Sequence, residues 1–425
     1  MARGDPSHVV RTFTFALAIV LAASVARLAA QQPSAIPALM RDATVRSALD
    51  IARTTEPQTI EDQIRFCEVA APPFKESARA EVLRRQFIQL GLQNVRVDRA
   101  GNVLGDRPGE MTHPHLVLAA HLDTVFPEDT DVKVTRRGQR LEGPGIGDNC
   151  RGLAVLVAVV RAMNQAGVRT SGTVTFVADV GEEGLGDLRG MKALFGETLK
   201  DQIDRFVSID NADPQVTIVG VGSHRYRITF KGPGGHSFAE FGLPNPANAL
   251  GRAIAKIAEF QVTGEPHTTF NVGRIGGGTS VNAIPAEAWM EVDLRSSDPA
   301  ALAALDTRLR QAVDRAAVEE NTRWGRPGVI TVTKDLVGDR PAGSIAEDAP
   351  IVATALATAR AVGLSGGISE GSTDANLAMN LKIPAIAIGG GGRSINAHAP
   401  NEAFDATDAW KGTANAVLLT IALAR

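Results

Sequence analysis

Four short apolar runs constrain the fold of this chain most strongly. Apolar and polar residues do not alternate along them, so they favour strands covered on both faces, as in a mainly parallel sheet flanked by helices. An apolar helix predicted over 152–166 lies between the first two runs, which is typical of an α/β sandwich. The runs occupy 116–120, 174–178, 206–209 and 385–388.

The segment 223–337 has a different pattern. It predicts a strand, a helix, two strands, a helix and a final strand, the order of a small ferredoxin-like α+β domain. The α/β pattern then resumes, and 425 residues exceed what one ordinary core holds. We therefore expect an α/β catalytic domain in two parts, 31–222 and 338–425, with the ferredoxin-like domain 223–337 inserted between them.

The first thirty residues differ from the rest in composition. Arg3 and Arg11 precede an apolar run at 13–26, and small residues follow at 28–30. This order is typical of a secretory signal peptide, and the apolar run is shorter than the ~20 residues of a membrane-spanning helix. We expect residues 1–30 to direct export, to the periplasm or out of the cell; an uncleaved anchor is the alternative.

Side chains that can bind metal ions follow each of the four apolar runs. Ligands in open α/β sheets bind beyond the carboxyl ends of the strands, so we expect these side chains to meet there. Imidazole and carboxylate groups suit zinc, and five ligands divide naturally between two ions that share one carboxylate, for which Asp148 is the best candidate. The five are His121, Asp148, which follows a glycine-rich loop at 143–147, Glu183, Asp210 and His398.

The spacing also suggests roles for two further carboxylates. Asp123 lies two residues beyond His121, so on an extended segment it could accept the second imidazole N–H. Glu182 and Glu183 face opposite ways when extended, so one can bind metal while the other holds the attacking water and transfers its proton. A lone His-X-Asp, Glu-Glu pair or glycine loop is common in ordinary structure. The prediction therefore depends on their joint placement after successive strands.

Seven motifs occur in order along residues 57–425. They are HLDTV at 121–125, Gly147-Asp148 with Gly152, GEEG at 181–184, Asp210, GHS at 235–237, NAIP at 282–285 and HAPNE at 398–402. This ordered set resembles the zinc metallopeptidase family that includes peptidase T, aminoacylase, glutamate carboxypeptidase and succinyl-diaminopimelate desuccinylase.

The resemblance implies a site with two zinc ions per subunit, or cobalt or manganese in their place. His121 and Asp210 would hold one ion, Glu183 and His398 the other, with Asp148 between them. Glu182 is implied as the general base and Asp123 as the orienting residue. The implied reaction is attack of a zinc-bound hydroxide on an amide carbonyl.

The resemblance also implies that the inserted domain is a dimerisation or lid domain of a homodimer. His236 would then reach the reaction centre, often that of the partner subunit, and polarise the scissile carbonyl. Asn282 and Arg295 match positions that contact substrate, Arg295 through its planar guanidinium. From the residues alone, His236 is an ordinary turn histidine, and Arg295 suits a structural salt bridge nearly as well.

The substrate class follows from smaller features. Asp210 and the GSTD segment at 371–374 resemble the aminopeptidase and dipeptidase branch of the family. Carboxypeptidase-like members usually have Glu at the position of Asp210. The residues after Asp148, Asn149-Cys150-Arg151-Gly152, depart from the frequent Asp-Met-Lys-Gly-Gly pattern. We expect an exopeptidase acting on di- or tripeptides. An N-acyl-amino-acid amidohydrolase or carboxypeptidase is the alternative.

Two further expectations concern partners and thiols. The net charge of −3 offers no basis for binding nucleic acid or membranes. A non-enzymatic binding protein with a degenerate site would have lost ligands or the base, and none is missing.

Cys67 and Cys150 are expected to be free thiols rather than a bridge, since Cys150 lies beside the metal-ligand candidates.

Overall fold

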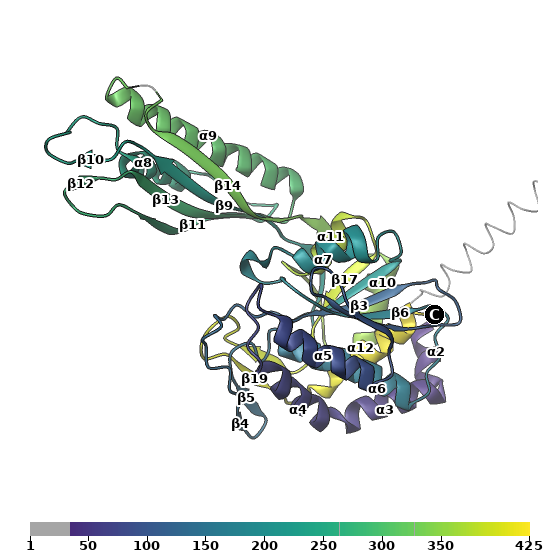
Figure 1. The fold of residues 1–425 in the computed structure, drawn as a ribbon. Coiled ribbons are helices and arrows are strands. Elements are labelled where there is room, and N and C mark those ends of the chain that lie inside the picture. The colour runs from purple at the N-terminus through teal and green to yellow at the C-terminus, as the bar shows by residue number, and fades with distance from the viewer. Residues whose placement is uncertain (1–34, 263, 327) are drawn as a thin grey trace, which may run out of the picture.

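The computed structural model describes residues 35–425 except 263 and 327. The predicted signal peptide, 1–30, lies outside these residues. Figure 1 shows a large α/β body from which a narrower extension projects. Within the described ranges, no helix is both long enough and apolar enough to cross a membrane.

The large body is built on a nine-stranded sheet in the order β1-β2-β6-β3-β7-β17-β8-β15, with β16 beside β8. Its central strands β6, β3, β7 and β17 are parallel and buried, as the four apolar runs predict. The strands are β1 (Gln93–Val97), β2 (Val103–Arg107), β3 (Leu116–His121), β6 (Val174–Asp179), β7 (Arg205–Ile209), β8 (Val216–Gly220), β15 (Gly343–Ser344), β16 (Ile368–Gly371) and β17 (Ala385–Ile388).

Helices cover both faces of this sheet. Phe176 and Val177 enter different cores, because successive strand residues point to opposite faces. One face carries α3 (Ala43–Thr54), α5 (Ser77–Gln89), α6 (Cys150–Gln165), α10 (Pro350–Ala361) and α12 (Trp410–Leu423), with α2 (Ile36–Arg41) and α4 (Glu56–Cys67) packed against them. The other face carries α7 (Arg189–Ala193), the π-helical turn η4 (Leu194–Thr198) and α11 (Ala375–Asn380).

The extension is a ferredoxin-like α+β sandwich with its own core (Figure 1). Its antiparallel sheet has the order β11-β13-β9-β14, and α8 and α9 pack against it. The elements are β9 (Gly222–Lys231), α8 (Pro246–Ala258), β11 (Thr268–Gly277), β13 (Glu287–Ser296), α9 (Pro299–Arg323) and β14 (Thr331–Arg340), with β10 (Gly235–His236) and β12 (Ala283–Ile284) paired at the far end. The division of the chain at 223 and 337 stays a prediction.

A small antiparallel sheet joins two loops of the large body. It has the order β18-β19-β5-β4, formed by β4 (Thr135–Arg137), β5 (Arg140–Glu142), β18 (Arg393–Ile395) and β19 (Ala403–Asp405). The glycine-rich loop after β5 is thereby held beside the loop between β18 and β19. Each of these loops carries one of the predicted metal ligands.

Candidate metal centre

The five predicted metal ligands converge at the carboxyl end of the parallel strands. His121 is the last residue of β3, and Asp210 directly follows β7. Glu183 follows β6 after a turn at Gly181, whose φ of +73° favours glycine. Asp148 precedes α6, and His398 belongs to the loop between β18 and β19.

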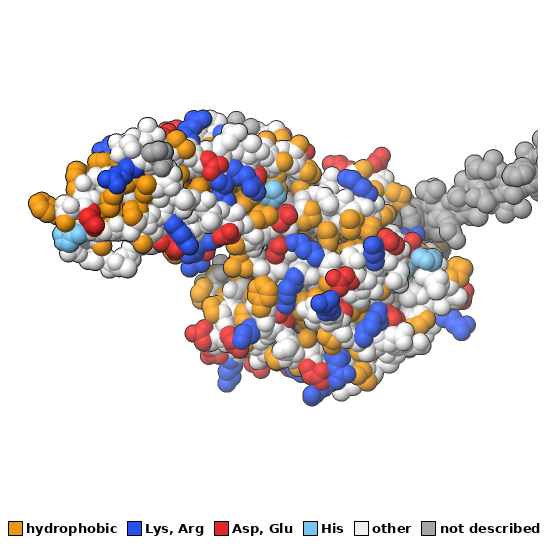
Figure 2. Space-filling model, turned by 45° about the horizontal axis from the view of Figure 1, so that its top comes forward, with side chains coloured by type: hydrophobic (Ala, Val, Ile, Leu, Met, Phe, Trp, Pro, Cys, Tyr) orange, Lys and Arg blue, Asp and Glu red, His pale blue; other side chains and the backbone are white. Residues whose placement is uncertain are grey.

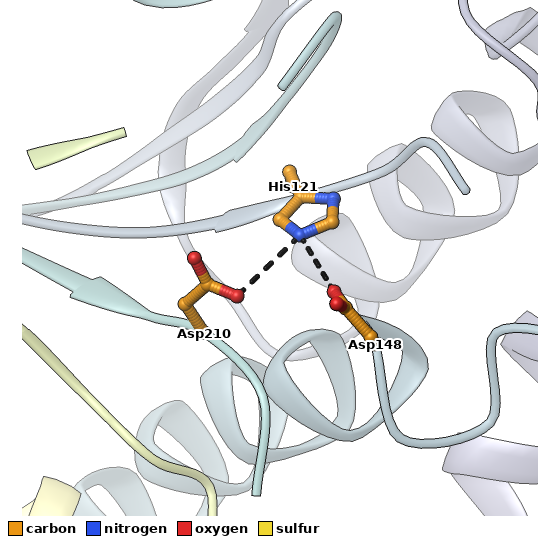
Figure 3. A group of neighbouring side chains, drawn as sticks. All are labelled: His121, Asp148 and Asp210. Carbon is orange, nitrogen blue, oxygen red and sulfur yellow. Dashed lines mark ion pairs between the residues drawn. The ribbon is translucent and has the colours of Figure 1, made fainter. Parts of the chain in front are cut away.

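Asp148 lies between the two histidines. Its Oδ1 is 3.2 Å from His121 Nε2, and its Oδ2 is 3.2 Å from His398 Nε2. Asp210 Oδ1 lies 3.7 Å from His121 Nε2, and Glu183 Oε1 lies 3.0 Å from His398 Nε2. Figure 3 shows His121, Asp148 and Asp210 pointing toward one another from separate segments. Asp148 thus belongs to two groups of potential ligand atoms, one with His121 and Asp210 and one with Glu183 and His398. A third group consists of His121, Glu182 and Glu183, and the ligand atoms of each group lie close to one another.

This donor set fits two divalent cations. His121 Nε2 and Asp148 Oδ1 are buried, and neither has a hydrogen-bond partner among the described residues. Imidazole nitrogen and carboxylate oxygen are the donors that zinc takes at catalytic sites. Hydrogen bonds to Asp148 and Glu183 raise the pKa of His398 to about 10. The carboxylates therefore strongly favour positive charge at this position.

Glu402 positions the loop that carries Asp148. Its Oε2 accepts a hydrogen bond from Gly145 N at 2.9 Å, and its Oε1 accepts from Gly147 N at 2.9 Å and Asp148 N at 3.1 Å. A Cβ at Gly147 would lie 2.3 Å from Ser394 Oγ, so any larger residue there would displace the Ser394 side chain. Burial raises the pKa of Glu402 to about 7, although the three hydrogen bonds that its carboxylate accepts act to lower this pKa. Glu402 belongs to the HAPNE motif at 398–402, from which the sequence predicts no role for it.

Asp123 makes a contact that differs from the predicted one. His121 Nδ1 is 3.0 Å from the main-chain oxygen of Asp123, whereas the Asp123 carboxylate is 3.8 Å away. A carbonyl oxygen only accepts, so the proton sits on Nδ1 and Nε2 is free to bind metal. The carboxylate instead accepts hydrogen bonds from Glu182 N at 3.1 Å and Glu183 N at 2.8 Å. Asp123 therefore positions both the imidazole and the Glu182–Glu183 turn.

Glu182 is paired with Arg340, which sequence analysis missed. Arg340 Nη1 donates to Glu182 Oε1 at 2.8 Å and to Ser372 Oγ at 3.1 Å, and its Nη2 donates to the Glu182 carbonyl. The two side chains are only 4% and 7% exposed, Arg340 first. Burial raises the pKa of Glu182 to about 8, and the charge of Arg340 opposes that rise. A carboxyl group that titrates near neutral pH is suited to accept and return a proton.

A pocket of about 250 Å³ opens beside these groups. It is lined by metal-ligand candidates and by Arg225, Arg295 and Arg340. Arg295 Nε and Arg225 Nε each donate to the Asp293 carboxylate, at 2.7 and 3.0 Å. Arg295 is thus at the site and in a salt bridge at once. Arg225 is a further cation that sequence analysis missed, because one arginine in an alternating strand carries no recognisable signal.

His236 and Asn282 lie together at the far end of the extension, remote from the metal centre of their own chain (Figure 1). Ser237 N donates to the Asn282 carbonyl at 3.0 Å, and His236 Nδ1 accepts from two backbone N–H groups. Exposed Phe238 and Val281 lie beside them in sequence. Figure 2 shows hydrophobic side chains at this free end.

The two cysteines are free thiols and both are buried. Cys67 Sγ donates to the Pro144 carbonyl at 3.2 Å, in the glycine-rich loop. Cys150, the first residue of α6, points into the core below this loop. Neither thiol belongs to the groups of potential metal ligands found among the described residues.

The comparisons agree with this arrangement. Residues 117–422 match the model of Peptidase family M20/M25/M40. Carboxypeptidase G2 of Pseudomonas sp. (strain RS-16) is 28% identical over 59% of this chain and 63% of its own length. A tripeptidase structure from Staphylococcus aureus has a TM-score of 0.72 and 25% identity over 87% of this chain and 98% of its own. The Bacillus subtilis YxeP structure, described as a dinuclear metal binding peptidase, has a TM-score of 0.63 and 17% identity over 88% and 99%. This chain belongs to Peptidase family M20/M25/M40.

Proposed function

We propose that this chain is a di-zinc aminopeptidase that removes the amino-terminal residue from di- and tripeptides. The observation that carries the proposal is Asp148 between two histidine-containing ligand groups, with the buried Glu182 carboxyl group beside them. Membership of the family establishes a metallopeptidase or amidohydrolase. The likeness to the tripeptidase supports the narrower substrate class.

His121 and Asp210 would hold one ion and Glu183 and His398 the other, with Asp148 shared. Zinc, or cobalt or manganese in its place, would polarise the scissile carbonyl and make water a stronger acid. His121 presents Nε2 for this purpose because the Asp123 carbonyl fixes its tautomer.

Glu182 would take the proton of the attacking water and return it to the leaving amine. Arg340 holds the Glu182 carboxylate by a buried hydrogen bond and opposes its protonation. The Asp123 carboxylate anchors the backbone of the same residue. The base is therefore held from two sides before substrate arrives, which is what a positioned proton-transfer group requires.

A homodimer would complete the site. His236 and Asn282 are far from their own metal centre, and the exposed apolar residues Phe238 and Val281 lie beside them in sequence. In the proposed dimer these two residues of one subunit would approach the substrate at the other, with His236 polarising the scissile carbonyl. Residues 1–30 would direct export of the protein, so its substrates would be extracellular or periplasmic peptides.

A second candidate is an N-acyl-amino-acid amidohydrolase or carboxypeptidase. The arginine-lined pocket favours it, because guanidinium groups bind carboxylates in bidentate fashion. Carboxypeptidase G2 among the relatives points the same way.

Turnover on two matched peptide sets separates the candidates. One set has a free amine and a blocked carboxyl end, and the other has an acylated amine and a free carboxyl end. The proposal expects the zinc-loaded protein to cleave the first set. Cleavage confined to the second set would refute the aminopeptidase assignment while leaving the proton-transfer role of Glu182 intact.

A further inference from the structure

A second pocket also borders the metal centre. Its volume is about 320 Å³, and it shares Asp148, Asp210 and Ser372 with the arginine-lined pocket. Among the described residues, no lysine or arginine lines it. The polar and acidic residues found in this pocket alone are Asn211, Asp213, Gln215, Thr217, Ser369, Glu370 and Thr373.

The two pockets therefore differ in the charged side chains that each adds to the shared metal ligands. Arg225 and Arg295 line one of them, while Asp213 and Glu370 line the other. Neither of these two carboxylates belongs to the ligand groups of the metal centre. A substrate that spans the shared ligands would meet negative charge at one end and positive charge at the other.

The acidic pocket also offers hydroxyl groups for a hydrogen-bond donor. Thr373 lines the pocket and is 3% exposed, yet its Oγ1 has no hydrogen-bond partner among the described residues. A buried hydroxyl without a partner is unfavourable, so a ligand that reached Thr373 Oγ1 after a small shift of its neighbours would be stabilised there. Thr217 Oγ1 and Ser369 Oγ, 3.1 Å apart, add further acceptor lone pairs.

We propose that this pocket binds the free α-ammonium group of the substrate's amino-terminal residue, with Asp213 and Glu370 determining that specificity. The inference rests on the proposed function, since it places a peptide across the metal centre. An ammonium group has three donors, which suits two carboxylates and a hydroxyl. The carboxyl end of a short peptide would then face the arginines.

Glu370 has a second contact that the test must separate from ammonium binding. Its Oε1 lies 2.9 Å from Nδ1 of His267, which precedes β11 of the extension. Replacing Glu370 therefore removes a link to the extension as well as a pocket charge. Asp213→Asn removes only a pocket charge, and His267→Gln removes the link while keeping the Glu370 carboxylate.

Calorimetric binding at pH 6.5 tests the proposal in zinc-loaded protein that carries Glu182→Gln in every variant, so that leucinamide is bound but not hydrolysed. The probes are leucinamide, its des-amino analogue 4-methylpentanamide, and N-acetyl-lysinamide, whose only charge is on the side chain. Asp213→Asn and Glu370→Gln should each weaken leucinamide binding by about tenfold, the low end of what a hydrogen bond to a charged group contributes. Binding of 4-methylpentanamide should not change. His267→Gln and the control Glu110→Gln, exposed at the opposite end of the sheet, should bind leucinamide like the Glu182→Gln parent.

Two results would overturn the proposal. One is binding of leucinamide to the Glu182→Gln parent no tighter than that of 4-methylpentanamide. The other is an effect of the two substitutions on N-acetyl-lysinamide alone, which would make the pocket a site for a cationic side chain. Failure of the proposed function can be distinguished from failure of this proposal. If only the proposed function is wrong, the protein does not cleave peptides, yet leucinamide binding still depends on Asp213.

Discussion

Replacing Glu182 by Gln should separate catalysis from stability. The Gln carbonyl can still accept the hydrogen bond that Arg340 Nη1 donates to Glu182 Oε1, so the fold and the metal ligands should be kept. Gln cannot take a proton from water. A positioned acid–base group is worth ~10²–10⁴-fold in rate, so kcat should fall by about that factor while bound zinc is unchanged.

The same substitution should stabilise the metal-free protein. Burial raises the pKa of Glu182 to about 8 from 4.5, so the folded state holds this proton more tightly than the unfolded state. Wild-type stability therefore falls as pH rises from about 4.5 to about 8, and Gln removes that loss. At pH 7 the gain is at most roughly 3 kcal/mol, because each tenfold change in protonation is worth about 1.4 kcal/mol.

Urea unfolding of the metal-free wild type and Glu182→Gln at pH 5 and pH 7 measures this gain, and peptide hydrolysis of the zinc-loaded proteins measures the rate. The advantage of the variant should be larger at pH 7 than at pH 5. A variant with near-normal kcat would refute the role of Glu182. A variant several kcal/mol less stable than the wild type would refute the reasoning from burial.

Three further results are expected. Arg340→Met should shift the acidic limb of the pH–rate profile to higher pH, since Arg340 lowers the pKa of Glu182. At pH 7 kcat/KM should fall by about tenfold or more. An acidic limb at unchanged pH would contradict the pairing. Zinc binding at pH 7 should release about one proton more from the wild type than from His398→Gln, because the pKa of His398 is about 10 and metal binding requires a neutral imidazole. Titration calorimetry in buffers of different ionisation enthalpy counts the released protons. Equal release from the two proteins would contradict the assignment of His398 as a metal ligand. Glu402→Ala should destabilise the metal-free protein by about 2 kcal/mol or more in urea, since two buried N–H groups and one partly buried N–H group lose their acceptor. An unchanged midpoint would show that Glu402 does not hold the loop.

The sequence predicts the parallel core well because its signal is local. Each central strand is an unbroken apolar run, and the side chain that follows it in sequence lies at the same edge of the sheet in space. The sequence alone therefore predicts that His121 and Asp210 lie together. The alternating strands and amphipathic helices of the extension likewise predict the ferredoxin-like order, which the structure confirms.

Contacts that join distant segments were not predictable in the same way. Arg340 reaches Glu182 across 158 positions, and Glu402 reaches Gly145 across 257. Neither residue belongs to a local periodic pattern that would suggest a partner. The Asp123 contact was predicted to the wrong acceptor atom, because residue spacing does not distinguish a side-chain carboxylate from the main-chain carbonyl of the same residue.

The metal content of the purified chain tests the central claim most directly. After saturation with zinc and dialysis, elemental analysis should find two zinc ions per wild-type chain, as expected for a site in which Asp148 joins two ligand groups. Asp148→Ala should hold at most one. A wild type that saturates with a single ion, or an Asp148→Ala variant that still holds two, would contradict the shared-carboxylate centre on which the proposed function depends.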